Sequence, residues 1–187
     1  MSFPNTWYSQ TSLPRAARPE LNTDETCDVC IIGAGIAGLT AALELIRRGK
    51  RVIILEAHQV AWGASGRNGG VVSPGWAEGS GAIRKKLGLE NARTLFQMSV
   101  EGVEIVRRNI AELALTGCNP SAGTIRVKRY DDSASVKNHI DTMRRDFAYE
   151  LNFLDTAQVR ERAHTRRYFQ GGEDPNALQF HPLNYCL

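Results

Sequence analysis

Two short apolar runs flank a segment with helical spacing near the start of the chain. Residues 28–32 and 51–55 are rich in β-branched residues and almost continuously apolar, which is typical of parallel strands covered on both faces. Residues 36–48 between them carry an apolar stripe that ends at Gly49, as expected of a helix with a glycine stop. The stripe consists of Leu39, Ala42, Leu43 and Ile46. Together the three segments predict a right-handed βαβ unit.

Further along the chain the spacing of the apolar residues changes several times. Apolar residues recur every three or four positions over residues 91–115 and 133–150, which predicts two helices. Apolar and charged residues alternate over 123–129, which predicts a half-buried strand. Asp155 and Gln158 form a capping-box signal for a further short helix.

Two segments show neither period. Residues 1–26 are polar and contain three prolines, so we expect an extended arm that packs on the surface or is mobile. Seven of the nineteen residues from 63 to 81 are glycine, with Pro74 added, so we expect no regular element there. A loop of this composition indicates a backbone that has to fit closely against something.

Composition excludes several classes of protein. With 42% hydrophobic and 23% charged residues, the 187-residue chain fits one or two globular domains, not a disordered or fibrous protein. The net charge of +3 comes from a mild basic excess in the middle of the chain, which favours a solvated surface over a nucleic-acid site. The longest uncharged stretch is too short to cross a bilayer, and no signal peptide is apparent.

The four cysteines are too few and too scattered for a secreted disulfide scaffold, which favours the cytoplasm. Cys27 and Cys30 have the spacing of a redox or zinc pair. Residues three apart in a strand project to opposite faces, however. We therefore expect two buried structural thiols, and no metal site.

A glycine-rich turn follows the first predicted strand. Gly33 permits a tight turn, Gly35 leaves room for a pyrophosphate to approach the backbone, and Gly38 allows the helix to pack closely on the strands. The helix N-terminus would then direct its amides at the phosphates. The full motif is Gly33, Ala34, Gly35, Ile36, Ala37 and Gly38.

Glu56 lies eighteen residues after Gly38, at the end of the second predicted strand. A carboxylate there can accept both ribose hydroxyls of an adenosine and would repel a 2′-phosphate. The pattern therefore indicates NAD or FAD instead of NADP. The alternative is a glycine-rich βαβ turn without a ligand.

Residues 27–70 resemble the FAD-dependent oxidoreductases of the D-amino-acid oxidase superfamily, in particular the γ-glutamylputrescine oxidase branch, which acts on amines and amino acids. The resemblance is most specific in the block from Gly63 to Gly70, GASGRNGG. It implies FAD as the cofactor and places part of this block near the flavin ring and pyrophosphate. The cofactor-binding residues expected outside the first glycine motif are Glu56, Ala57, Ser65, Arg67, Asn68, Gly69 and Gly70.

The chemistry of this second loop agrees with that expectation. Small residues let the backbone approach a flat ring, and Arg67 and Asn68 offer donors to phosphate, flavin carbonyls or a substrate carboxylate. The alternative for Arg67 is an ordinary surface charge on a mobile loop. His181 precedes Pro182 at an expected helix start and is more simply a hydrogen-bonded structural histidine than a base.

The resemblance also implies a fold and its limits. We expect an α/β protein, α+β overall, with a Rossmann-like FAD-binding unit and part of a mixed-sheet substrate domain, apparently truncated. The expected parts are an arm (1–26), the N-terminal part of an FAD-binding domain (27–117) and a partial substrate domain (118–187). The expected partner is a small-molecule amine or amino acid, and no catalytic residue is identified. An NAD-dependent dehydrogenase fragment and a non-catalytic remnant are the alternatives.

Overall fold

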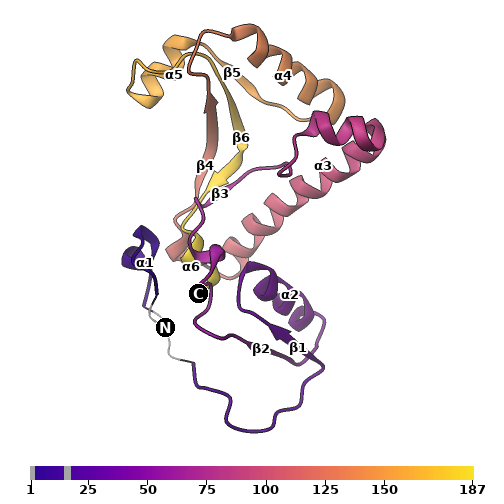
Figure 1. Cartoon of the computed structure of the whole chain (residues 1–187), viewed down its shortest axis with the longest axis vertical. Helices are drawn as coiled ribbons and strands as arrows, with labels where there is room; N and C mark the ends of the chain where they lie inside the picture. The colour runs from indigo at the N-terminus through magenta and orange to yellow at the C-terminus, as the bar shows by residue number, and fades with distance from the viewer. Residues whose placement is uncertain (1–2, 15–17) are drawn as a thin grey trace. The chain divides into compact units, whose positions relative to one another are not determined.

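A computed structural model describes residues 3–14 and 18–187. The chain divides into two compact units (Figure 1). The first contains residues up to Gly70 together with 113–119 and 180–187, and the second contains residues 71–112 and 120–179.

The predicted βαβ unit is present in the first unit. Strand β1 (Val29–Ile32) and strand β2 (Val52–Leu55) pair in parallel, and helix α2 (Ile36–Arg47) connects them (Figure 1). The Gly33 amide donates to the Leu55 carbonyl at 2.7 Å and extends the ladder by one bond. The strand ends therefore hold the glycine turn and the residues after β2 side by side.

Strand β1 is not covered on both faces, so this part of the sequence prediction was wrong, whereas Val52, Ile53 and Ile54 of β2 are all half-buried. Burial alternates along β1: Val29 and Ile31 are half-buried, whereas Cys30 is exposed and Ile32 is 88% exposed. Helix α2 packs on the Ile31 face, where a Cβ on Gly38 would lie 3.2 Å from Ile31 Cγ2. Cys27 is half-buried, so neither it nor Cys30 is a buried thiol.

Four short elements complete the first unit. The capping box of Thr6 and Ser9 starts α1 inside the arm that was expected to be extended, and a five-residue helix is too short to show a period. Likewise η1 forms within the glycine-rich segment expected to lack regular structure, and β3 of the second unit also begins there. The four elements are α1 (Trp7–Thr11), η1 (Ala64–Gly66), η2 (Thr116–Cys118) and α6 (Pro182–Cys186).

The second unit is an antiparallel sheet with helices. The strand order is β3-β6-β4, and β5 also pairs with β6. The strands are β3 (Val71–Val72), β4 (Ser121–Val127), β5 (Asn152–Leu154) and β6 (Gly171–Gln179). The helices are α3 (Ser80–Glu112), α4 (Ser133–Phe147) and α5 (Thr156–Ala163). The capping box predicted for α5 is present.

Strand β6 has a sequence, GGEDPNALQ, that shows no strand period. Asp174 explains how it is held: its Oδ1 accepts the Tyr149 hydroxyl at 2.7 Å and the amides of Asn176 and Ala177. The bonds lie beside a register shift between Ala122 and Thr124 in β4. A carboxylate thus organises the irregular part of the strand.

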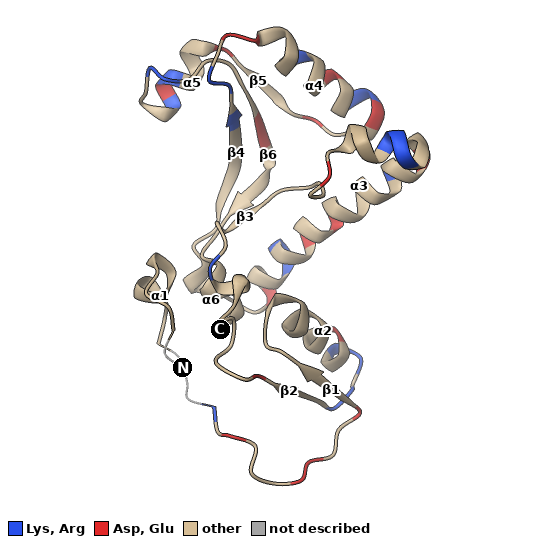
Figure 2. Cartoon of the chain, in the orientation of Figure 1, with Lys and Arg blue, Asp and Glu red and all other residues tan. Residues whose placement is uncertain are grey.

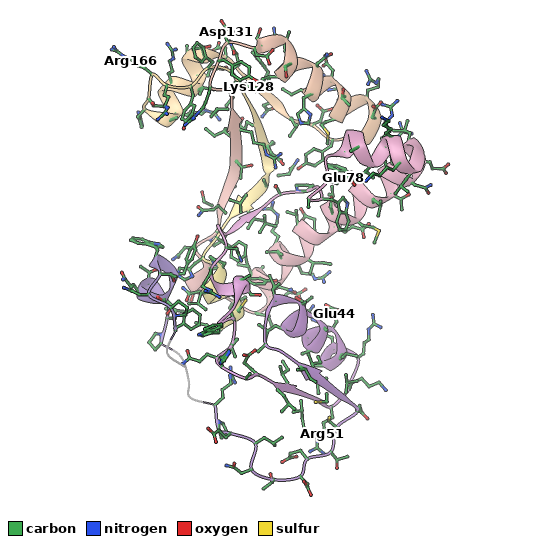
Figure 3. The ribbon with its side chains drawn as sticks, in the orientation of Figure 1. Glu44, Arg51, Glu78, Lys128, Asp131 and Arg166 are labelled. Carbon is green, nitrogen blue, oxygen red and sulfur yellow. The ribbon has the colours of Figure 1, made fainter. Side chains whose placement is uncertain are left out.

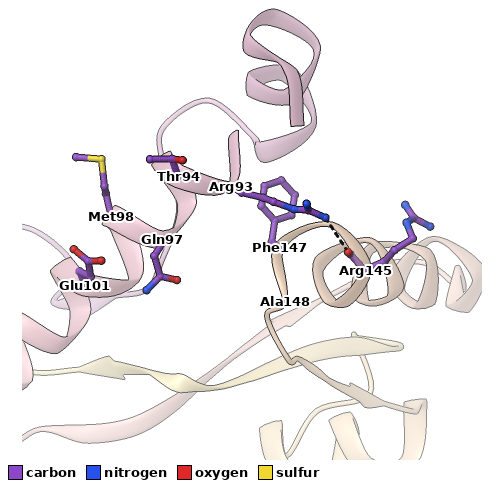
Figure 4. A pocket seen from close by; sticks show the side chains of 8 residues that line it. All are labelled: Arg93, Thr94, Gln97, Met98, Glu101, Arg145, Phe147 and Ala148. Atoms are coloured by element: carbon purple, nitrogen blue, oxygen red, sulfur yellow. Dashed lines mark hydrogen bonds between the residues drawn. The ribbon is translucent and has the colours of Figure 1, made fainter. Parts of the chain in front are cut away.

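Helices α3 and α4 pack through an aromatic cluster of Phe96, Phe147 and Tyr149. Figure 2 shows basic residues gathered near the start of α3, where Arg84 pairs with the buried Asp146 of α4. An open groove lies between the two helices (Figure 4). Its lining residues are Arg93, Thr94, Gln97, Met98, Glu101, Arg145, Phe147 and Ala148.

Helix α3 starts eleven residues before the predicted position, and it changes direction at Gly88, where φ is 78°. The glycine permits this left-handed backbone. Within residues 3–14 and 18–187, the helices are either too short or too polar to span a bilayer.

We predict that the four thiols react at different rates. Cys30 is exposed, whereas burial raises the pKa of Cys118 to about 11 and that of Cys186 to about 12. Because the thiolate is the reactive form, Ellman's reagent at pH 8 should modify Cys30 quickly and Cys118 and Cys186 only after unfolding. Cys30→Ser should remove the fast phase. A slow Cys30 in the native chain would show that its sheet face is covered in solution.

Candidate functional site

The turn between β1 and α2 presents a helix N-terminus. Gly33 has φ 99°, and Gly35 is the N-cap with an extended backbone. The Leu39 amide donates to the Gly35 carbonyl at 2.9 Å. The first amides of a helix have no acceptor within it. Ile36 and Ala37, which begin α2, are exposed, and because Ser65 Oγ accepts the Ile36 amide, an anionic ligand would approach this end at Ala37 and at the Ser65 hydroxyl.

Gly38 sets the distance between α2 and β1. A Cβ on Gly38 would fall on the Gly33 carbonyl oxygen and within 3.2 Å of Ile31 Cγ2. Any larger residue would therefore push α2 away from the strand. This is the close packing that the motif predicts for its third glycine.

Ser65 joins the second glycine-rich loop to the first. Its Oγ accepts the Ile36 amide at 2.9 Å, and a Cβ on Gly35 would lie 3.1 Å from the same atom. The two segments that the sequence suggested separately thus meet at the start of α2. The sequence motifs alone did not predict this hydrogen bond.

Glu56 lies beside the same turn. Its Oε2 accepts the Ala34 amide at 2.8 Å and its Oε1 accepts the His58 amide at 2.9 Å. These two backbone hydrogen bonds, that from Ala34 first, lower the pKa of the carboxyl group. An ionised carboxylate has about four acceptor positions, so the exposed Glu56 keeps capacity for the two hydroxyls of a ribose. Ala57 follows it and is also exposed.

The second loop is held largely by its own groups. The Asn68 amide donates to the carbonyls of Ser65 (2.9 Å) and Ala64 (3.3 Å) and accepts the Gly70 amide (2.8 Å). Asn68 therefore shapes the loop in this structure. Gly69 is exposed, and a Cβ there would meet nothing within 4 Å.

Gly70 ends the loop with a φ of 68°. A Cβ there would overlap the Phe180 carbonyl oxygen, and the Phe180 amide donates to the Gly70 carbonyl at 2.9 Å. The loop is thereby joined to the residues that lead into α6.

Arg67 belongs to a stack of side chains. Its guanidinium carbon lies 5.1 Å from the centre of the Trp62 ring, and the His58 ring lies 4.5 Å from the same indole. The Arg67 Nε donates to the Gly63 carbonyl at 3.1 Å. Both the tryptophan contact and the backbone bond orient this exposed cation.

Ala61 connects the two loops and was missed by the sequence reasoning. Its amide donates to the Ala34 carbonyl at 2.9 Å, and its carbonyl accepts the Gly66 amide at 3.1 Å. The residue is 1% exposed and has φ 57°. A left-handed alanine has no signature in the sequence, so nothing could have identified it.

His181 has the structural role that the sequence favoured. It is the N-cap of α6, where its Nδ1 accepts the Asn184 amide at 3.1 Å, and Pro182 starts the helix. Burial lowers the pKa of the ring.

Comparisons with known proteins place this geometry in a family. Residues 28–187 match the family of FAD dependent oxidoreductases known as DAO. Because the match covers most of the chain, the chain belongs to this family, whose cofactor is FAD.

The chain is 36% identical to the probable oxidoreductase OrdL of Haemophilus influenzae over 90% of its own length and 39% of that protein. It is 32% identical to the gamma-glutamylputrescine oxidoreductase of Escherichia coli over 98% of its length and 43% of that protein. Among solved structures, the L-amino acid deaminase from Proteus vulgaris, with a specific insertion sequence deleted, superposes with a TM-score of 0.69 at 20% identity. That superposition covers 98% of this chain and 45% of the other. The chain thus spans about two fifths of the length of these relatives.

We predict that Gly38→Ala destabilises the first unit. The added methyl group must displace the Gly33 carbonyl or α2, and overpacking of this kind costs about 2 kcal/mol. Gly63→Ala is the control, because its Cβ would meet nothing within 4 Å and its φ of −76° suits alanine. Urea unfolding of both variants measures the difference. Equal stability of the two would contradict the close packing at Gly38.

Proposed function

We propose that this chain carries the FAD-binding part of an oxidoreductase that oxidises a primary or secondary amine or an amino acid. The observation that supports it most is the meeting of two glycine-rich segments at the start of α2, where Ser65 Oγ accepts the Ile36 amide. Glu56 lies at the same turn, bonded to Ala34. The Ser65 hydroxyl, which can still donate its own proton, and the exposed start of α2 at Ala37 are therefore our candidate donors for a pyrophosphate, and Glu56 is our candidate acceptor for a ribose.

The residues present fit FAD. The absent Cβ of Gly35 leaves space at the helix N-terminus, which Ser65 borders at 3.1 Å, so we assign the pyrophosphate to the turn from Gly33 to Gly38. We assign the adenosine ribose to Glu56, with Ala57 next to it. The segment from Ser65 to Gly70, with the Arg67 cation, is then assigned to the rest of the cofactor.

Bound FAD would supply the hydride-accepting chemistry that the oxidation of a carbon bearing an amine requires. The part of the chain described here would bind and orient the cofactor. The name of the Escherichia coli relative supports an amine substrate of the γ-glutamylputrescine kind. No side chain of this chain is assigned a catalytic role, and the divisions at residues 27 and 118 and a cytoplasmic location stay predictions.

We predict that the purified chain binds FAD more tightly than NADH, as measured by fluorescence titration. Gly35→Val should abolish FAD binding, because its side chain would occupy the space beside Ser65 Oγ. Circular dichroism checks that the variant folds. Tighter binding of NADH would favour the dehydrogenase alternative, and no binding of either dinucleotide would favour the non-catalytic alternative.

A second prediction concerns the charge of Glu56. Glu56→Gln keeps one amide acceptor but loses the ionised carboxylate, so we expect FAD affinity to fall about tenfold, equivalent to ~1.4 kcal/mol. Glu44→Gln is the matched control: Glu44 lies on α2 (Figure 3) and pairs with Arg47 at 2.6 Å. An ion pair of this kind contributes little. Isothermal titration should separate the two variants, and equal affinities would refute the ribose assignment.

A further inference from the structure

The N-terminal strap, residues 3–14, packs behind the second glycine-rich loop. Gly66 is buried in the middle of this loop. A Cβ on Gly66 would lie 2.5 Å from the Ala61 oxygen, 2.9 Å from Leu183 Cδ1 and 3.3 Å from Phe3 Cζ. The rear of the loop is thus fitted against α6 and the strap, while its neighbour Ser65 bonds to α2 on the other side.

The strap is fastened to α6 at three points. The Tyr8 ring packs edge-on against His181 with ring centres 4.9 Å apart. His181 Nε2 lies 3.1 Å from the Thr11 hydroxyl. The Leu13 amide donates to Asn184 Oδ1 at 2.9 Å.

The Asn184 side chain connects α6 to both the strap and η2. Besides accepting from Leu13, it donates through Nδ2 to the Gly117 carbonyl at 2.7 Å. The backbone amide of Asn184 donates to His181 Nδ1. The Leu13 side chain also fills the space beside Gly117, where a Cβ would lie 2.5 Å from Leu13 Cδ1. Asn184 is buried, so losing any of these bonds would leave a polar group unsatisfied.

We propose that the strap positions the Gly63–Gly70 loop for cofactor binding, with Phe3 and His181 as positioning residues that act through Gly66 and Ser65. The inference rests on the proposed FAD site. Nothing in the strap needs to touch the cofactor. Its effect is preorganisation: a loop already held in the binding geometry loses less conformational entropy when a ligand binds.

The hydrogen bonds of His181 make this arrangement sensitive to pH. Nδ1 accepts the Asn184 amide, so in the neutral ring the proton is on Nε2 and points to Thr11. A second proton on Nδ1 would oppose the Asn184 amide and remove the cap of α6. Neutral histidine is therefore the form that holds the strap.

The titratable side chains on the neighbouring elements are Tyr8 of α1, Tyr185 and Cys186 of α6, Cys118 of η2 and His58, which stacks on Trp62 before the second loop. His58 is present in the wild type and in His181→Asn alike, so the difference between the two isolates His181. Tyrosine and cysteine are uncharged in this range in free peptides. The second loop contributes the permanent cation of Arg67.

Burial lowers the folded-state pKa of His181, so its unfolded state binds more protons. The contribution of neutral His181 to the stability of the fold is fully present above its unfolded-state pKa of about 6.5. This contribution is lost as the pH falls from about 6.5 through the lower folded-state pKa.

The test measures FAD affinity and amide exchange on the full chain. We expect Phe3→Ala to raise the Kd for FAD about tenfold at pH 7.5. The exposed Trp7→Ala in the same strap, whose side chain is 73% exposed, should leave the Kd unchanged. Without FAD, Phe3→Ala should also speed hydrogen exchange of the Gly66 and Ile36 amides, whereas Trp7→Ala should not.

His181→Asn tests whether the pH dependence of the Kd for FAD comes from His181, which a purely structural role of the residue would not affect. Asparagine can cap a helix but does not titrate. The Kd for FAD of the wild-type chain should rise several-fold from pH 7.5 to 5.5, and that of His181→Asn should rise clearly less. Unchanged exchange of Gly66 and Ile36 in Phe3→Ala, or an equal pH response of wild type and His181→Asn, would overturn the proposal. Altered exchange in a chain that binds no FAD would support the positioning and contradict only the proposed function.

Discussion

The contact between α2 and β1 at Gly38 is the constraint on which the candidate site depends. With no side chain between them, the helix begins directly above the end of the strand, beside the Gly33 carbonyl. The Ala34 amide of the turn then donates to Glu56, and the Ile36 amide of the helix donates to Ser65, so the two acceptors come from two later segments. A wider spacing would separate these three groups and leave a helix end without a binding site.

Much of this arrangement could be predicted because it depends on local chemistry. The turn and the close packing of helix on strand require glycine at the motif positions. The length of the βαβ unit predicts an acidic residue at the position of Glu56. The same holds for Asp155 and Gln158, whose capping box needs only four consecutive residues. Such signals survive in a single sequence.

The features that were missed depend on contacts between distant residues. Helix α1 has no apolar period, and Thr11 in it contacts His181, 170 positions away. Strands were expected after residue 167, and β6 is one of them, but its bounds depend on the Tyr149–Asp174 hydrogen bond, which its sequence does not indicate. The expected burial of Cys30 failed because burial depends on which elements cover a strand, and its sequence does not specify them.

The central claim is that the start of α2 and the second loop form one FAD site. Amide chemical shifts of the ¹⁵N-labelled chain, recorded during a titration with FAD, test it most directly. The account predicts that the largest shifts occur at Ile36, Ala37 and the residues from Ser65 to Gly70. Shifts confined to the groove of Arg93 and Arg145, or no shifts at saturating FAD, would contradict it.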